Sequence, residues 1–295
     1  MSESTSEAGS VPAVGVVGLG VMGGAMAQHI RAAGHDVVGF DIEEGRAAGC
    51  GVRPAASPAE MAAEVDVVVF SLPSVESLRE ASQAVASARK AGLVVVETGT
   101  FGIEAKQEAR TILEAAGAAV LDAPLSGTGL QAADATLIVY ASGDPDAFAV
   151  AEPILGYIGQ RTFYLGEFGN GSRMKFVANL LVSVHTLAAA EAHRLGEASG
   201  LDPQVVQEVI GAGVGSSKIF DIRGPMMASR TYEPPSARLA IIRKDSEIIA
   251  AHARAVGALT PLLDAALPQY RAAMDRGLGD LDAAVLHRHL AETSP

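Results

Sequence analysis

Lys175 and Asn179 are the two side chains of this sequence whose types and spacing best suit chemistry on a small molecule. They lie four residues apart in GNGSRMKFVANLL, residues 169–181, and therefore share one face of a helix. The glycines and the serine before them are typical of a helix start. A lysine near a helix N-terminus lies at the unfavourable end of the dipole, and desolvation further disfavours its ammonium form. Such a lysine can serve as a general acid.

Two interpretations of this pair stay open on the residues alone. In the first, Lys175 exchanges a proton with a substrate oxygen, and Asn179 hydrogen-bonds the substrate or orients the amine. In the second, Lys175 extends to solvent from an amphipathic helix, and Asn179 only caps a neighbouring element. The first interpretation needs a site for a reaction partner elsewhere in the chain.

A glycine-rich loop near the N-terminus offers such a site. The stretch VVGLGVMGGAM carries the spacing G-x-G-x-x-G after a predicted strand and before a predicted helix, which is the context that a dinucleotide-binding motif requires. The first glycine permits a tight turn, the second lets a pyrophosphate approach the backbone, and the third lets helix and strand pack closely. The predicted cofactor contacts here are Gly18, Leu19, Gly20, Val21, Met22 and Gly23.

Asp41 ends the second predicted strand, eighteen residues past Gly23. A carboxylate there can accept both ribose hydroxyls of NAD and repels the 2′-phosphate of NADP, so NAD is the predicted cofactor. Arg46 follows closely and can turn toward a phosphate, which keeps NADP open. The alternative is a glycine-rich turn that binds no dinucleotide, with Asp41 as the N-cap of a helix over residues 42–49.

Three further loops follow predicted strands. Leu72 and Pro73 come after the third strand, Thr100 after the fourth, and Ser126 with Gly127 after the fifth. In doubly wound folds ligands lie beyond the carboxyl ends of the strands. The hydroxyl and backbone N–H groups at Ser126 and Gly127 can hold a carboxylate. Each loop alone could be an ordinary turn; their joint placement beside the glycine loop favours a binding site.

The elements that must position these residues follow from the pattern of apolar runs. Continuous Val/Ile/Leu runs, typical of a parallel sheet covered on both faces, predict strands at 14–17, 36–40, 65–70, 93–97, 119–122, 136–141 and 161–165. Helices are predicted between these strands. After the last strand only helices are predicted, at 172–199, 203–212, 217–229, 236–256, 260–276 and 280–292. The predicted fold is a doubly wound α/β Rossmann domain over 12–168, joined by a long helix to an all-α domain over 169–295.

Composition excludes several classes of protein. The 295 residues carry a formal net charge of −12, which argues against a nucleic-acid or anionic-membrane partner. Cys50 is the single cysteine, so an internal disulfide or a cysteine-based zinc site is excluded. The polar stretch 1–11 is predicted to be a disordered tail without signal-peptide features, and no apolar run is long enough for a membrane span. We therefore expect a cytoplasmic protein.

The order and spacing of six motifs resemble those of the β-hydroxyacid dehydrogenases, the family of 3-hydroxyisobutyrate dehydrogenase and tartronate semialdehyde reductase. The motifs are GLGVMG (18–23), LP (72–73), ETGT (97–100), DAPLSG (122–127), GNGSRMKFVANLL (169–181) and RKDSEI (243–248). The resemblance covers nearly the whole chain, from Val14 to about His289. It implies reversible NAD(P)-dependent oxidation of a small 3-hydroxy acid, or reduction of its semialdehyde or keto form, by a homodimer or homotetramer.

The resemblance also implies roles for individual residues. Lys175 falls on the catalytic lysine of the family, Asn179 on its substrate-binding asparagine, and Ser126 with Gly127 on the loop that holds the substrate carboxylate. Thr100 and Lys244 fall on positions that contact the cofactor or the nicotinamide end of the site.

The sequence departs from the family in the predicted substrate pocket. In SGTGLQAADA three residues stand where the family has glycine, namely Thr128, Gln131 and Ala135, and Lys218 stands where the family often has an aromatic residue. Thr128 is counted with the predicted substrate contacts. The departures indicate a more polar or larger hydroxy acid than 3-hydroxyisobutyrate.

Other classes of function fit the sequence less well. Imine reductases that resemble this family generally have another residue in place of the lysine, so Lys175 argues against that activity. A non-catalytic cofactor-binding or scaffold module would be expected to lack the lysine and to carry basic appendages. The seven histidines lie in no convincing metal-ligand spacing, so no metal site is predicted. Asp245, beside Lys244, is interpreted as a helix-surface or salt-bridge residue rather than a general base.

Overall fold

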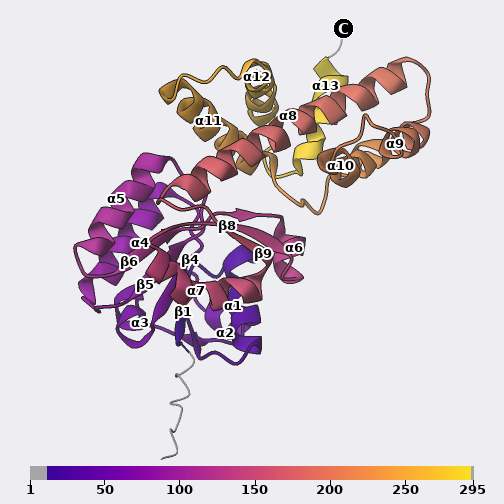
Figure 1. The fold of residues 1–295 in the computed structure, drawn as a ribbon. Helices are drawn as coiled ribbons and strands as arrows, with labels where there is room; N and C mark the ends of the chain where they lie inside the picture. The colour runs from indigo at the N-terminus through magenta and orange to yellow at the C-terminus, as the bar shows by residue number, and fades with distance from the viewer. Residues whose placement is uncertain (1–11, 294–295) are drawn as a thin grey trace, which may run out of the picture. The chain divides into compact units, whose positions relative to one another are not determined.

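The computed structural model describes residues 12–293, which form two compact units that divide after Ser172. The predicted disordered tail, residues 1–11, lies outside the described residues. The first unit combines a sheet with helices, and the second is helical (Figure 1). The longest helix, α8 (Asn170–Ala198), begins in the first unit and continues into the second.

The sheet of the first unit contains nine strands in the order β3-β2-β1-β4-β5-β6-β8-β7, with β9 paired to β8. The strands are β1 (Val14–Val17), β2 (Val37–Phe40), β3 (Arg53–Pro54), β4 (Val67–Phe70), β5 (Val94–Glu97), β6 (Ala119–Asp122), β7 (Leu125–Ser126), β8 (Leu137–Gly143) and β9 (Gly159–Tyr164). From β3 to β6 all neighbours are parallel. The order reverses between β1 and β4, and in open α/β sheets such a reversal opens a crevice at the carboxyl ends of the strands.

The sheet departs at one edge from the parallel arrangement that the apolar runs indicated. β8 runs antiparallel to both β6 and β7. The chain between β6 and β8 holds only the short strand β7 and the five-residue helix α6 (Gly129–Ala133), so it lacks the crossover helix that usually carries a chain back to start a parallel strand. α6 instead packs against α1.

Helices cover both faces of the sheet (Figure 1). They are α1 (Val21–Ala32), α2 (Arg46–Gly49), α3 (Pro58–Glu64), α4 (Val75–Ser87), α5 (Ile103–Glu114) and α7 (Pro145–Ile158). Neighbouring residues of a strand point to opposite faces. In β4, Val67 and Val69 pack toward α1 and α7, whereas Val68 and Phe70 pack toward α3, α4 and α5.

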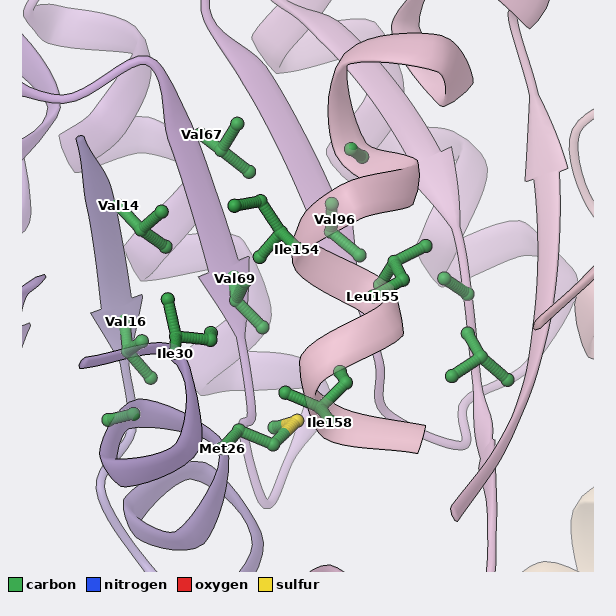
Figure 2. Close-up of a cluster of buried hydrophobic side chains, with 14 of the residues drawn as sticks. Val14, Val16, Met26, Ile30, Val67, Val69, Val96, Ile154, Leu155 and Ile158 are labelled. Atoms are coloured by element: carbon green, nitrogen blue, oxygen red, sulfur yellow. The ribbon is translucent and has the colours of Figure 1, made fainter. Parts of the chain in front are cut away.

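The core beneath α1 and α7 is made of aliphatic side chains. Figure 2 shows Ile154 of α7 among valines of the central strands, with Met26 and Ile30 of α1 on the same face of the sheet. These side chains are fully or almost fully buried. Burial of each of these side chains contributes about 1.5–3 kcal/mol of transfer free energy. The packing stabilises the central strands and, with them, the position of the glycine loop that follows β1.

The second unit contains only helices among its described residues. They are the remainder of α8, then α9 (Pro203–Gly211), α10 (Lys218–Ser229), α11 (Leu239–Ala255), α12 (Pro261–Asp275), a 3-10 turn (Ala283–Val285) and α13 (Leu286–Thr293). Its apolar core includes Phe220, Met227, Leu239 and Tyr270. The predicted helices at 236–256 and 280–292 begin later than expected because Asp282 accepts hydrogen bonds from the backbone N–H groups at 236, 237 and 284 and holds those turns outside the helices.

Across residues 12–293, none of the helices combines the length and apolar character needed to cross a lipid bilayer.

Candidate active site

The glycine loop has the backbone that its sequence predicts. Gly18 follows β1 with φ +89°, a left-handed conformation that glycine adopts without strain. A Cβ on Gly23 would lie 1.8 Å from the carbonyl oxygen of Gly18, so only glycine lets α1 start this close to the turn. The first and third glycines of the motif are therefore required by close backbone approach.

The N-terminus of α1 is open in the way a phosphate site requires. Gly20 is the N-cap residue and no side chain caps the helix, so the first-turn N–H groups of Val21 and Met22 have no capping side chain. A Cβ on Gly20 would meet only a guanidinium nitrogen of Arg46, at 3.5 Å. This uncapped helix start beside a glycine with space above it fits the pyrophosphate of a dinucleotide.

Asp41 lies directly after β2 and is tied to the same loop. Its Oδ2 accepts the N–H of Leu19 at 2.6 Å and lies 3.5 Å from Arg46, and its Oδ1 accepts the N–H of Glu43. α2 begins only at Arg46 with Gly45 as its N-cap, so Asp41 is not the N-cap of a helix over 42–49. The carboxylate braces the glycine loop through the N–H of Leu19. Leu19 contributes only backbone, because its side chain is buried.

The loops after the other strands adjoin the glycine loop. A Cβ on Gly18 would lie 3.4 Å from the Leu72 side chain, and one on Gly129 would lie 2.7 Å from Cγ1 of Val21. The Thr98 hydroxyl donates to the carbonyl of Phe70 at 2.6 Å and joins the loop that carries Thr100 to the loop that carries Leu72. The first unit therefore brings the glycine loop, the loops that carry Leu72 and Thr100, and the start of α6 to one edge of the sheet.

The predicted carboxylate loop is more constrained than its sequence indicated. Gly127 has φ +144°, and a Cβ there would lie 2.6 Å from Leu137. The N–H of Thr128 donates to the side-chain oxygen of Gln131 at 2.7 Å, so that N–H is already used within the loop. Gln131 is a residue whose role we missed; the spacing Thr-x-x-Gln, typical of a capping box, could have revealed it. Ser126 and Gly127 remain the loop's candidates for an anion.

Lys175 and Asn179 lie in the second unit, one helical turn apart on α8, and both are buried, with 8% and 6% of their surface exposed. Asn179 donates from Nδ2 to Oδ2 of Asp245 on α11 at 2.9 Å. This bond fixes which side of the amide faces α11, so the orientation of Asn179 is determined by a residue of another helix.

Asp245 is not a helix-surface residue. It is 5% exposed, and besides Asn179 it contacts the Lys244 ammonium at 3.1 Å. Of the two roles that the sequence left open, the structure supports the salt-bridge residue and not the helix-surface residue. Asp245 links two predicted site residues, Asn179 and Lys244.

Replacement of Asp245 with alanine should therefore disturb Asn179. Because Asn179 is a predicted substrate contact, we expect KM for the substrate to rise by roughly tenfold, with a smaller change in kcat. A buried amide that loses its hydrogen-bond partner costs about 1–3 kcal/mol. Steady-state kinetics measures this, with the exposed Asp264→Ala on α12 as the control. Unchanged KM in Asp245→Ala would show that Asn179 does not depend on this bond.

Comparisons with known proteins agree with the two-part architecture. Residues 13–166 match the profile described as the NAD binding domain of 6-phosphogluconate dehydrogenase, and residues 169–290 match that of the NAD-binding of NADP-dependent 3-hydroxyisobutyrate dehydrogenase. The chain is 34% identical over 281 residues to L-threonate dehydrogenase from Cupriavidus necator. The alignment covers 92% of this chain and 94% of that relative. The chain belongs to the β-hydroxyacid dehydrogenase family.

Two further similarities support this membership. Glyoxylate/succinic semialdehyde reductase 2, chloroplastic, from Arabidopsis thaliana is 32% identical over 94% of this chain and 78% of its own length. The solved structure of 3-hydroxyisobutyrate dehydrogenase from Salmonella typhimurium superposes with a TM-score of 0.85 at 31% identity, over 93% of this chain and 98% of the other. The predicted family and fold class are thereby confirmed. The protein is a nicotinamide-dependent oxidoreductase of hydroxy acids that takes NAD or NADP.

Proposed function

We propose that the protein oxidises a small 3-hydroxy acid reversibly, with Lys175 as the general acid and base. The observation that carries this proposal is a lysine buried one turn into α8, one turn before an asparagine whose amide is oriented by Asp245. A lysine on a solvated helix face would need neither the burial nor the oriented neighbour. Desolvation disfavours the ammonium form of a lysine, which lets such a side chain exchange a proton more readily near neutral pH.

The chemistry divides between the residues as follows. Bound in the glycine loop, the nicotinamide cofactor supplies the hydride acceptor or donor. The Lys175 amine would accept the proton of the substrate hydroxyl when the alcohol is oxidised to a carbonyl, and the ammonium would return that proton when the carbonyl is reduced. Asn179 hydrogen-bonds the substrate. The Ser126 hydroxyl and the backbone N–H groups at Ser126 and Gly127 bind the substrate carboxylate.

The substrate class can be tested with a panel. We infer a hydroxy acid that is more polar or larger than 3-hydroxyisobutyrate, because Thr128, Gln131 and Lys218 replace smaller or apolar residues of the family pattern. The test measures NADH or NADPH absorbance with L-threonate, 3-hydroxyisobutyrate and D-glycerate, and in the reverse direction with glyoxylate and succinic semialdehyde. Higher kcat/KM for L-threonate or D-glycerate than for 3-hydroxyisobutyrate is expected. Failure of every acid and aldehyde to change the absorbance would contradict the proposal.

We further propose that NAD is preferred over NADP, on the strength of Asp41. Asp41→Ala should weaken NAD binding by roughly tenfold and NADP binding less, because the alanine loses the ribose contact and also removes the charge that repels a 2′-phosphate. Titration with both reduced cofactors gives the two dissociation constants. Asp36→Ala is the control, because Asp36 is exposed and directly precedes β2. A greater loss for NADPH than for NADH would overturn the assignment.

Finally, we propose that the protein is a homodimer or homotetramer assembled through its helical unit. Apolar side chains are exposed there at helical spacing, Val177 and Leu181 on α8 and Val205 and Val209 on α9. Large exposed apolar surfaces commonly mark association sites. Light scattering on the eluted protein tests this, and a monomer at micromolar concentration would refute it.

A further inference from the structure

Three charged side chains are sealed inside the first unit, and none of them takes part in the chemistry above. Glu97 ends β5, Asp122 ends β6, and Lys106 reaches them from α5. Their exposed fractions are 2%, 0% and 1%. The Lys106 ammonium lies 2.6 Å from Glu97 and 2.7 Å from Asp122. Ionised groups are rarely buried so completely, and burial of such a pair is no general source of stability.

Asp122 connects this cluster to the start of α8. Its carboxylate accepts the N–H of Ser172 at 2.7 Å and the Ser172 hydroxyl at 2.8 Å. The preceding N–H, that of Gly171, donates to the Ser142 hydroxyl at 2.9 Å, and that hydroxyl also contacts Asp122. The first N–H groups of a helix need acceptors, and a negative charge is favoured there. Asp122 is therefore the N-terminal cap of α8, supplied from another element.

Glu97 connects the same cluster to a cofactor loop. Its Oε1 accepts the N–H of Gly99 at 2.7 Å, one residue before Thr100. Burial raises the pKa of Glu97 above its ordinary value, although the neighbouring Lys106 opposes this shift. Burial by itself would lower the pKa of Lys106, but the carboxylates of Asp122 and Glu97 raise it above its ordinary value. Lys106 is thus held as a cation between two carboxylates that each brace a different functional segment.

We propose that Lys106 is a positioning residue, which acts through Asp122 to fix the first turn of α8 and through Glu97 to fix the loop that carries Thr100. Lys175 lies three residues beyond Ser172 on the same helix, a rise of about 4.5 Å. Ser172 and Lys175 therefore lie about one turn apart on the same continuous helix. The inference rests on the proposed role of Lys175, because a shift of α8 matters to turnover only if that amine does chemistry.

A double variant that restores the net charge of the cluster tests the proposal more sharply than removal of the lysine alone. In the wild type two carboxylates and one ammonium sum to −1. Lys106→Met keeps an unbranched chain of similar length and leaves two buried carboxylates uncompensated. The double variant Lys106→Met/Glu97→Gln restores the sum to −1, leaves Asp122 to cap α8, and keeps an amide oxygen for Gly99.

We expect kcat of Lys106→Met to fall by roughly tenfold to a hundredfold, since a displacement of about 1 Å can cost a hundredfold in rate. The dissociation constant of NADH, measured by its fluorescence, should rise by a smaller factor than kcat falls, because the glycine loop is untouched and only the loop that carries Thr100 loses its brace. The double variant should regain most of the lost kcat. The assay uses whichever acid of the panel turns over fastest, and thermal unfolding records how much of each variant is folded.

Three outcomes would overturn the inference. They are an unchanged kcat in Lys106→Met, a double variant as slow as the single one, and a loss of kcat that merely follows a loss of folded, NADH-binding protein. Lys175→Met is assayed in parallel. If it retains wild-type turnover, the proposed acid–base function fails; if it is inactive while Lys106→Met is normal, only the positioning role fails.

Discussion

Replacement of Lys175 with methionine is expected to lower turnover by about a hundredfold or more, the usual range for loss of a general acid or base. Methionine keeps the length and apolar stem of the side chain but cannot exchange a proton. NADH binding should remain near the wild-type value, because the cofactor loops of the first unit are unchanged. Steady-state rates with the preferred hydroxy acid, together with NADH fluorescence titration, measure both quantities.

Lys175→Arg is the matched variant that separates proton transfer from charge. Arginine preserves the positive charge and a hydrogen-bond donor but does not deprotonate in proteins. We therefore expect it to bind NADH normally and to remain as slow as the methionine variant. If arginine restored wild-type turnover, Lys175 would act as a fixed charge on the substrate, and the acid–base role would be wrong.

Gly23→Ala is expected to have the second largest effect. Its Cβ would lie 1.8 Å from the carbonyl oxygen of Gly18, and that oxygen belongs to backbone, which cannot rotate aside as a side chain can. Overpacking of this kind typically costs about 1–3 kcal/mol, which corresponds to roughly a tenfold to hundredfold loss of NADH affinity if the strain is relieved by moving the loop. If the loop does not move, the same strain appears as a lower unfolding temperature.

Gly156→Ala is the control for a glycine-to-alanine change in a helix of the same unit. No atom lies within 4 Å of a Cβ built there, and Gly156 lies within α7. Alanine is favoured over glycine inside a helix by about 1 kcal/mol, so this variant should bind NADH normally and melt no lower than the wild type. If Gly23→Ala matched it in both measurements, the close approach of α1 to Gly18 would not matter for cofactor binding.

The parts of the fold that local chemistry determines were predictable from the sequence. The turn at Gly18 needs a left-handed residue, and the carboxylate at Asp41 ends a strand beside that turn, so both could be inferred from nearby residues. The continuous apolar runs predicted the central strands because each is buried on both faces.

What the sequence did not reveal depends on partners far along the chain. The direction of β8 follows from how the chain leaves β6, not from the residues of β8 itself. Asp245 looked like a surface residue because its partner Asn179 is 66 residues away on another helix. The contacts among Glu97, Lys106 and Asp122 join three elements, and no single segment of sequence distinguishes a buried charge that has a partner from an exposed one.

The distance between the Lys175 amine and the substrate hydroxyl tests the central claim most directly. It can be measured in a crystal structure of the complex with NADH and the preferred hydroxy acid, a pair that cannot react because both are reduced. The account predicts that Nζ lies within hydrogen-bonding reach of that oxygen, about 2.6–3.2 Å, or is joined to it through one water molecule. An amine more than about 6 Å from the hydroxyl, with no bridging water, would contradict the account.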